Sequence, residues 1–244
     1  MKTNKLILRI PQVALLVMFT TMSFGCWNMP QEDRSSGNYI KEERDVGNFS
    51  SLDIGGAFTV ILLQGSEEKL VLEADAEEMS EIITEVVGDE LKIHTKPGWN
   101  ERFHEMTVYL TFKNLDNLDF SGAVEVKAQE ALTFDGLTMD VSGASEIDLD
   151  FTASKLEADF SGASELNFTG KCDKGYIEIS GAGEINAENM EFTDLVIELS
   201  GASQGKVFAT GVLKIDASGA STVKYKGGAK VSVNTSGASQ INEL

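Results

Sequence analysis

Carboxylate side chains recur along this chain at nearly constant spacing, and they are the residues best suited to chemistry. One set stands two positions before each of six repeated serines: Asp119, Asp140, Asp159, Glu178, Glu198 and Asp216. A second set stands four positions after four of those serines: Glu125, Glu146, Glu165 and Glu184. Clustered carboxylate oxygens are the ligands that calcium prefers, and two carboxylates in a cleft can hydrolyse a glycosidic bond. The sequence therefore raises two hypotheses, a cation site and a carbohydrate-active enzyme.

The regular repetition of these acids favours a solvated face over either kind of site. The Gly-Gly-x-Gly-x-Asp pattern of calcium-binding repeats is absent. A lyase would need Arg or Lys as its base, but no Arg follows Arg102, no His follows His104, and the Lys residues form no repeated column. We therefore predict no catalytic residue, no cofactor and no dedicated metal site. The first set of acids is kept as a weak candidate for divalent cations.

The serines belong to a Ser-Gly-Ala tripeptide that occurs seven times between residues 121 and 238. The steps from one Ser to the next are 21, 19, 19, 20, 18 and 18 residues. Apolar residues stand one, three and five positions before most of these serines, and five and seven positions after them. A spacing of two is the period of a strand with one face turned inward. Each unit is therefore predicted to be a strand, a Ser-Gly-Ala corner, a second strand and a looser corner.

Units of this length cannot bury their own apolar face and must stack on one another. We predict an all-β fold, a right-handed parallel β-helix with 18–21 residues per coil and two flattened sheets. General chirality favours the right-handed form. A left-handed, three-sided helix is the alternative, since 18 residues per coil would also suit it, but its hexapeptide period is missing.

The regular repeat covers residues 116–244, and the residues before it are predicted to belong to the same domain. Residues 47–115 are less regular, but Ile54-Gly55-Gly56-Ala57 echoes the corner. Asp75 resembles a helix N-cap, and we predict a short capping helix over residues 76–87 that covers the first coil. The loop of residues 97–104 holds Trp99 and Phe103, which either contact a ligand or, as we favour, pack over the first coils.

The first 25 residues have the pattern of an export signal, with a basic start and an apolar core too short to span a bilayer. Ser23-Phe24-Gly25-Cys26 is similar to a bacterial lipoprotein cleavage site, so we predict that Cys26 is lipidated. An ordinary signal peptide with an incidental Cys is the alternative. Residues 26–46 are predicted to be a flexible tether. Cys172 is expected to be buried and unpaired.

The formal net charge is −19, with 39 Asp and Glu against 20 Lys and Arg. This balance argues against binding to nucleic acid or to anionic lipid surfaces. We therefore expect contact with the membrane only through a lipid anchor.

The Ser-Gly-Ala corners, the Ile-Gly-Gly-Ala echo and the Glu-Ala-Asp helix start resemble the autotransporter-adhesin, head-GIN-domain family of exported bacterial proteins. The resemblance covers roughly residues 47–241. It implies a pectin-lyase-like, right-handed β-helix and a role in adhesion.

We expect a non-catalytic interaction or adhesion module, lipid-anchored in the cell envelope, whose partner is a glycan or an envelope or surface protein. One alternative is a carbohydrate-active enzyme of the pectin-lyase-like type. Another is a self-associating structural envelope protein, because the last coil has no evident cap. In that case a homo-oligomer would form through the C-terminal coil.

Overall fold

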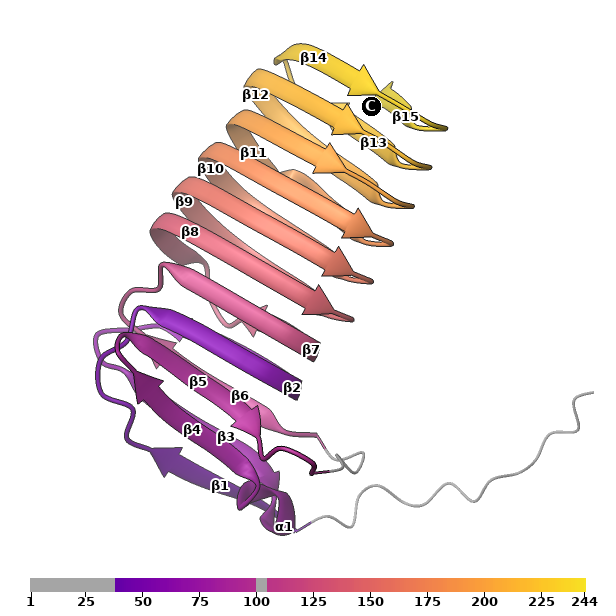
Figure 1. Cartoon of the computed structure of the whole chain (residues 1–244). Helices are drawn as coiled ribbons and strands as arrows, with labels where there is room; N and C mark the ends of the chain where they lie inside the picture. The colour runs from indigo at the N-terminus through magenta and orange to yellow at the C-terminus, as the bar shows by residue number, and fades with distance from the viewer. Residues whose placement is uncertain (1–37, 100–104) are drawn as a thin grey trace, which may run out of the picture. The chain divides into compact units, whose positions relative to one another are not determined.

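The computed structural model describes residues 38–99 and 105–244 (Figure 1). Within these residues, fifteen strands join into one continuous sheet that winds into a solenoid, with one short helix, α1 (Ala76–Met79). The strands are β1 (Tyr39–Arg44), β2 (Ser51–Gln64), β3 (Lys69–Asp75), β4 (Ile82–Val87), β5 (Glu90–Thr95), β6 (Thr107–Phe112), β7 (Asn117–Ala128), β8 (Leu132–Gly143), β9 (Glu146–Gly162), β10 (Glu165–Gly181), β11 (Glu184–Leu199), β12 (Gln204–Ala217), β13 (Thr222–Lys226), β14 (Lys230–Thr235) and β15 (Gln240–Glu243). The all-β solenoid predicted from the repeat is therefore confirmed.

Successive coils pair in parallel and in register, so equivalent positions of neighbouring repeats lie side by side. Between β8 and β9, for example, Ser142 pairs with Ser161 and Gly143 with Gly162. The Ser-Gly-Ala corners consequently stack in one file along one edge of the solenoid (Figure 1). The second bends are looser, and β9, β10 and β11 run through them as continuous strands.

Each corner is held by a hydrogen bond that repeats from coil to coil. After the first repeat, the Ala N–H of each corner donates to the carbonyl oxygen of the Gly in the preceding corner, at 2.7–2.9 Å. The corner glycines from Gly122 to Gly237 have φ between +73° and +106°, where residues with a side chain are rarely found. A Cβ added to any of them would overlap the carbonyl oxygen of the glycine one coil below. Both facts restrict this position to glycine.

A second regularity of the corner was missed in the sequence. The residue after Ser-Gly-Ala is again Ser in five of the seven repeats. In the last three corners its hydroxyl donates to the carbonyl of the first Ser, as Ser221 does to Ser218 at 2.7 Å. The buried hydroxyls of Ser145 and Ser164 have no hydrogen-bond partner. In the three corners whose second serine is hydrogen-bonded, the glycine φ is +73° to +81°. In the earlier corners it is +100° to +106°.

The core consists of columns of inward side chains, as the spacing predicted. In one coil Leu156, Ala158 and Phe160 are all buried, five, three and one position before the corner Ser. Each large apolar side chain contributes roughly 1.5–3 kcal/mol when it is buried. One column consists of phenylalanine rings from successive coils, with neighbouring centroids 5.5–6.2 Å apart: Phe112, Phe134, Phe151 and Phe168. Stacking of identical positions thus supplies the continuous core that a single coil lacks.

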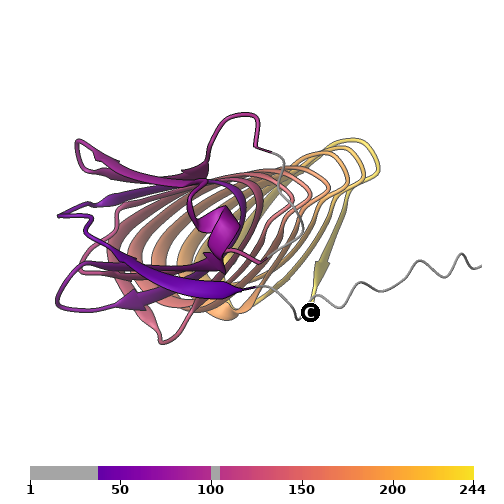
Figure 2. The same ribbon diagram turned by 90° about the horizontal axis from the view of Figure 1, so that it is seen from below.

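Antiparallel strands, with one turn of helix, form the N-terminal end (Figure 2). β1 pairs with β3, β3 with β6 and β4 with β5, all antiparallel. Asp75 caps α1 as predicted, accepting a hydrogen bond from the Glu77 N–H at 2.9 Å. The helix predicted over residues 76–87 is wrong beyond Met79, because residues 82–87 form β4. This segment is rich in β-branched residues, which favour a strand, and β5 supplies its partner.

The predicted tether of residues 26–46 is also corrected in part. Tyr39–Arg44 form β1, which pairs with β3 along its length, and Val46 is buried. The solenoid domain therefore includes residues before 47. The predicted export signal of residues 1–25, Cys26 and the first part of the tether lie outside the described residues.

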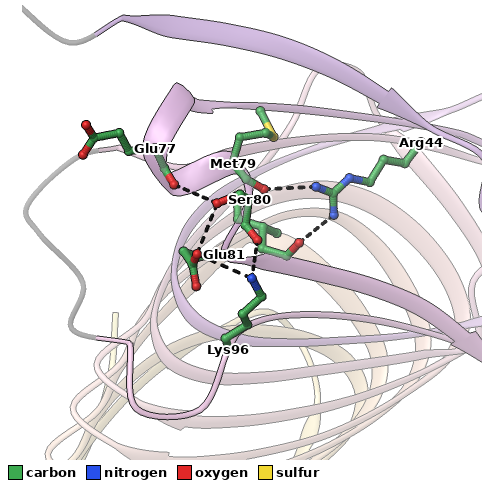
Figure 3. A network of polar contacts seen from close by, with 7 residues as sticks. Arg44, Glu77, Met79, Ser80, Glu81 and Lys96 are labelled. Carbon is green, nitrogen blue, oxygen red and sulfur yellow. Dashed lines mark hydrogen bonds and ion pairs between the residues drawn. The ribbon is translucent and has the colours of Figure 1, made fainter.

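Arg44 ties β1 to the neighbouring elements of this end (Figure 3). Its guanidinium donates to the carbonyl oxygens of Ile82 and Met79, at 2.8 and 3.2 Å, and to the Thr84 hydroxyl at 3.1 Å. Nearby, Lys96 Nζ donates to the Ser80 carbonyl at 2.7 Å. These side chains satisfy backbone carbonyls at the end of α1 and the start of β4.

Gly143→Ala is expected to destabilise the protein strongly, because the added methyl group would overlap the Gly122 carbonyl at a φ of +106°. Backbone strain alone costs roughly 1–3 kcal/mol at such a position. Gly136→Ala is the matched control, since a Cβ there meets nothing within 4 Å. Urea unfolding compares the two variants. Equal stability would contradict the close approach of the corners.

Ser221→Ala is expected to cost about 1 kcal/mol of unfolding free energy, because a buried hydrogen bond is lost. Ser164→Ala removes a buried hydroxyl without a partner, so it is expected to be neutral or slightly stabilising. Thermal unfolding measures both changes. An equal loss of stability in the two variants would show that the two kinds of corner do not differ in this way.

Candidate functional site: an acidic column beside the corners

The first set of acids singled out in the sequence forms one column on the outer surface, next to the file of corners. We call this set the acidic column, and its members pair in register across consecutive coils. Asp53 of β2, which no Ser-Gly-Ala tripeptide follows in the sequence, begins it. The column continues with Asp119, Asp140, Asp159, Glu178, Glu198 and Asp216. Neighbouring members are therefore separated by one strand spacing, about 4.8 Å between backbones.

The acidic column is neutralised by Lys92 at one end and stops at the neutral Asn234 at the other. At one end Lys92 Nζ lies 3.0 Å from Asp53 Oδ2 and 2.7 Å from Glu90 Oε2. At the other end Asn234 takes the place of the acid and donates to Asp216 Oδ2 at 3.0 Å. Among the described residues, no ion pair within 4.0 Å involves the members from Asp119 to Asp216. The middle of the column is thus a row of uncompensated charges.

The second set of acids forms a shorter column on the other side of the corners. Glu125, Glu146, Glu165 and Glu184 pair in register. Lys127 forms an ion pair with Glu125, and Lys206 Nζ lies 3.3 Å from Glu184 Oε1. This second column is therefore partly neutralised, which distinguishes it from the acidic column.

The surroundings of Asp119 in the acidic column disturb the ionisation of its carboxyl. Burial raises the pKa of its carboxyl above the usual range, and the charges of Asp53, Asp140 and Glu90 add to this effect. Lys92 acts in the opposite direction. A raised pKa means that the charged form of Asp119 costs free energy in the folded protein.

A shallow depression of about 80 Å³ opens on the column near its C-terminal end. Its polar lining comes from three carboxylates and two corner hydroxyls: Glu178, Glu198, Asp216, Ser200 and Ser218. Beside it, burial raises the pKa of the Tyr176 hydroxyl to about 12, and the carboxylates of Glu198 and Glu178 contribute. Ligand clefts usually hold about 300–1,000 Å³. The depression is therefore better suited to a side chain or small group of a partner than to an enclosed substrate.

The structure aligns the predicted acids but does not converge them on one point. Within residues 38–99 and 105–244, no group of three or more His, Cys, Asp and Glu side chains is gathered closely enough to hold a metal ion. The weak candidates for divalent cations therefore lie in a row rather than in a coordination sphere. What this arrangement provides is a repeating negative charge on a long face.

The remaining candidates fall outside this column. Trp99 is half-buried and packs against the core, which agrees with the packing role that we favoured, and ligand contact there stays a prediction. Phe103 lies outside the described residues. Cys172 is buried and unpaired, and burial raises the pKa of its thiol to about 11, so it stays protonated at neutral pH.

Residues 48–229 match the family model described as "Putative auto-transporter adhesin, head GIN domain". The chain belongs to this family. The match covers most of the solenoid, including all members of the acidic column. Among curated proteins, none matches the chain.

Solved structures share the solenoid of this head-GIN-domain chain. A "putative adhesin" from Bacteroides fragilis is 21% identical with a TM-score of 0.81, over 84% of this chain and 97% of its own. A "putative adhesin" from Parabacteroides merdae is 16% identical with a TM-score of 0.68, over 86% and 97%. A "putative lipid binding protein" from Parabacteroides distasonis is 20% identical with a TM-score of 0.62, over 86% and 98%. At these identities the likeness shows the fold.

In the described part of the head-GIN-domain chain, no helix has the length and apolar character needed to cross a membrane.

Asp119→Asn is expected to stabilise the head-GIN-domain solenoid at neutral pH and to have no effect in strong acid. A carboxyl whose pKa is raised on folding destabilises the protein above that raised pKa, and the effect disappears as the pH falls below the ordinary pKa of Asp. Removing one like charge is expected to raise Tm by roughly 1–3 °C.

Thermal unfolding at pH 7 and at about pH 2.5 tests this expectation. Asp173→Asn, at an exposed acid outside the acidic column, controls for the change in net charge. A lower Tm for Asp119→Asn at pH 7 would contradict the argument.

Proposed function

We propose that this chain is a non-catalytic adhesion module of the cell envelope that binds its partner through the face carrying the acidic column. The observation that carries the proposal is the row of uncompensated carboxylates, repeated in register over successive coils. Membership in an adhesin family agrees with it. A solenoid offers such a row because each coil adds one more copy of the same surface group.

The proposed partner is a glycan or an envelope or surface protein that presents cationic or neutral polar groups. Complementary charge favours approach and selects against like-charged polymers. Each contact on an exposed face is weak, so a repeating ligand that spans several coils would gain most from the column. The shallow depression at Glu178 and Glu198 would receive one projecting group of that ligand.

We further propose that the chain is exported and held in the envelope by a lipid on Cys26. The basic start, the short apolar core and the Cys that follows support this, as stated for the sequence. We also propose that the solenoid is right-handed and pectin-lyase-like. Mass spectrometry of the protein from bacterial membranes tests the anchor, because a diacylated Cys26 would be the first residue.

The adhesion proposal is tested by screening the purified protein against immobilised glycans and envelope proteins. For any target that binds, Asp140→Asn/Asp159→Asn is expected to weaken binding at least about tenfold, because two adjacent charges of the column are lost. Glu146→Gln/Glu165→Gln is the matched control, since it removes the same charge from the other side of the corners. Binding should also weaken as salt is raised.

Equal binding by both double variants would place the contact surface elsewhere. Cleavage of any uronate polymer by the protein would overturn the non-catalytic reading.

A further inference from the structure

The last coil of the solenoid presents an open sheet edge. β14 pairs with β12 and β15 with β13, and within the described residues no strand pairs with their other edges. Apolar side chains are uncovered there: Val233 is 48% exposed, although its counterparts Ile197 and Ile215 in the two preceding coils are buried. Val231 and Ile241 are only partly buried against the core. An edge with these properties readily accepts another strand.

The side chains of this coil lack the charges that their columns carry elsewhere. Asn234 stands where the acidic column has a carboxylate, and Gln240 stands where the second column begins with Glu. Asn242 occupies a column that holds Lys206 and Lys224 in the two preceding coils. Only Lys230 and Glu243 are charged in β14 and β15. A further layer could stack on these amides without repulsion between like charges.

Amide side chains in this solenoid already bond from coil to coil. Asn186 Nδ2 donates to Asn167 Oδ1 at 3.2 Å, one coil below. Asn234 Nδ2 donates to Asp216 in the same way, and its Oδ1 has no protein donor among the described residues. That oxygen is placed to accept a hydrogen bond from a strand added to the edge.

Charged side chains protect the opposite end of the solenoid, at β1, against pairing with another strand. Among the described strands none pairs with the outer edge of β1, but its sequence Tyr-Ile-Lys-Glu-Glu-Arg is dominated by charged residues. Lys41 and Arg44 are held in place by Glu73 and by backbone carbonyls of α1 and β4. Charged side chains on an edge strand oppose further pairing. The two ends therefore differ, and only the C-terminal coil is suited to accept a neighbour.

We propose that the last coil pairs with the same coil of a second copy of this chain, tail to tail about a two-fold axis. β14 lies antiparallel to β14 of the partner, and β15 antiparallel to β15 of the partner. Pairing centred on Val233 keeps inward-facing residues opposite inward-facing ones, and it sets Lys230 opposite a residue beyond the end of the partner's strand, so the two lysines are not directly opposed. A two-fold contact uses one surface twice and closes, whereas head-to-tail stacking would need the charged β1 edge.

The contact is expected to be reversible. Residues 230–244 supply about fifteen residues a side, fewer than the 20–30 of a standard interface. Added backbone hydrogen bonds compensate in part, as in other cases of strand addition. A concentration-dependent dimer is therefore expected rather than a permanent one. This contact is separate from partner binding by the acidic column, so either proposal can fail without the other.

Sedimentation velocity of the purified protein, from about 1 μM to about 500 μM, tests the proposal across the usual range of weak complexes. A monomer–dimer equilibrium is expected. Val233→Lys, which adds a charge to the open edge, should raise the dissociation constant at least tenfold. Ile40→Lys on β1 is the matched control at the other end and should leave it unchanged. Thermal unfolding of both variants confirms that each is folded.

A second experiment tests the orientation and does not depend on Val233→Lys. In a Cys26→Ser background, Ser232→Cys treated with a short bis-maleimide should give cross-linked dimers and nothing larger, whereas Tyr39→Cys should give none. A monomer at every concentration would overturn the proposal. Loss of association in the Ile40→Lys variant would also overturn it. So would a series of higher oligomers that Ile40→Lys abolishes, since both results indicate head-to-tail stacking.

Discussion

The close approach of corner glycines in successive coils is the constraint on which the rest of this structure depends. Each corner places its Ala N–H against the carbonyl of the glycine one coil below, and a side chain on the corner's own glycine would overlap that carbonyl. Because the bond repeats at every coil, the corner sets the register of the whole sheet. In-register stacking then places apolar side chains over apolar side chains, as in the phenylalanine column from Phe112 to Phe168.

The same register forces like charges together on the outside. A carboxylate two positions before each corner serine lies beside its counterpart, and at Asp119 the neighbouring charges of Asp53 and Asp140 add to the larger effect of burial in raising the pKa of the carboxyl. An exposed pair of like charges costs up to about 1 kcal/mol, which the burial of a single large apolar side chain outweighs. The column therefore persists because the core can support it. Among the described residues, the carboxylates from Asp119 to Asp216 have no ion-pair partner within 4.0 Å, and the external partner that we propose would compensate their charge.

The repeat itself could be derived from the sequence. The glycines indicate tight corners, the alternation of apolar residues indicates strands, and the constant step indicates stacked coils. The N-terminal end could not. Met79, Ile82, Ile83 and Val86 fit the spacing of a helix face, yet Ile82–Val87 form a strand because β5 offers a partner. Tyr39–Arg44 have the composition of a linker, and only pairing with β3 some thirty residues later makes them β1.

Only part of the candidate site could be predicted from the sequence. The acids were recognised by their spacing, but Asp53 was not, since its glycine corner lacks the serine. The neutral end of the column at Asn234 and the role of Lys92 depend on which strands become neighbours. The roles of Ser145 and Ser221 differ although both follow the same tripeptide, because the bend of the corner decides whether the hydroxyl reaches a carbonyl.

Distances between spin labels on the exposed corner alanines test the stacking of corners most directly. With Cys introduced in pairs at Ala144 and Ala163, and at Ala144 and Ala182, backbone separations of about 5 Å and about 10 Å are expected for one and two coil spacings. The first pair should therefore give the stronger dipolar broadening, and both should broaden the spectrum. Spectra without broadening, or a separation for the one-coil pair beyond that of the two-coil pair, would contradict the single file of corners.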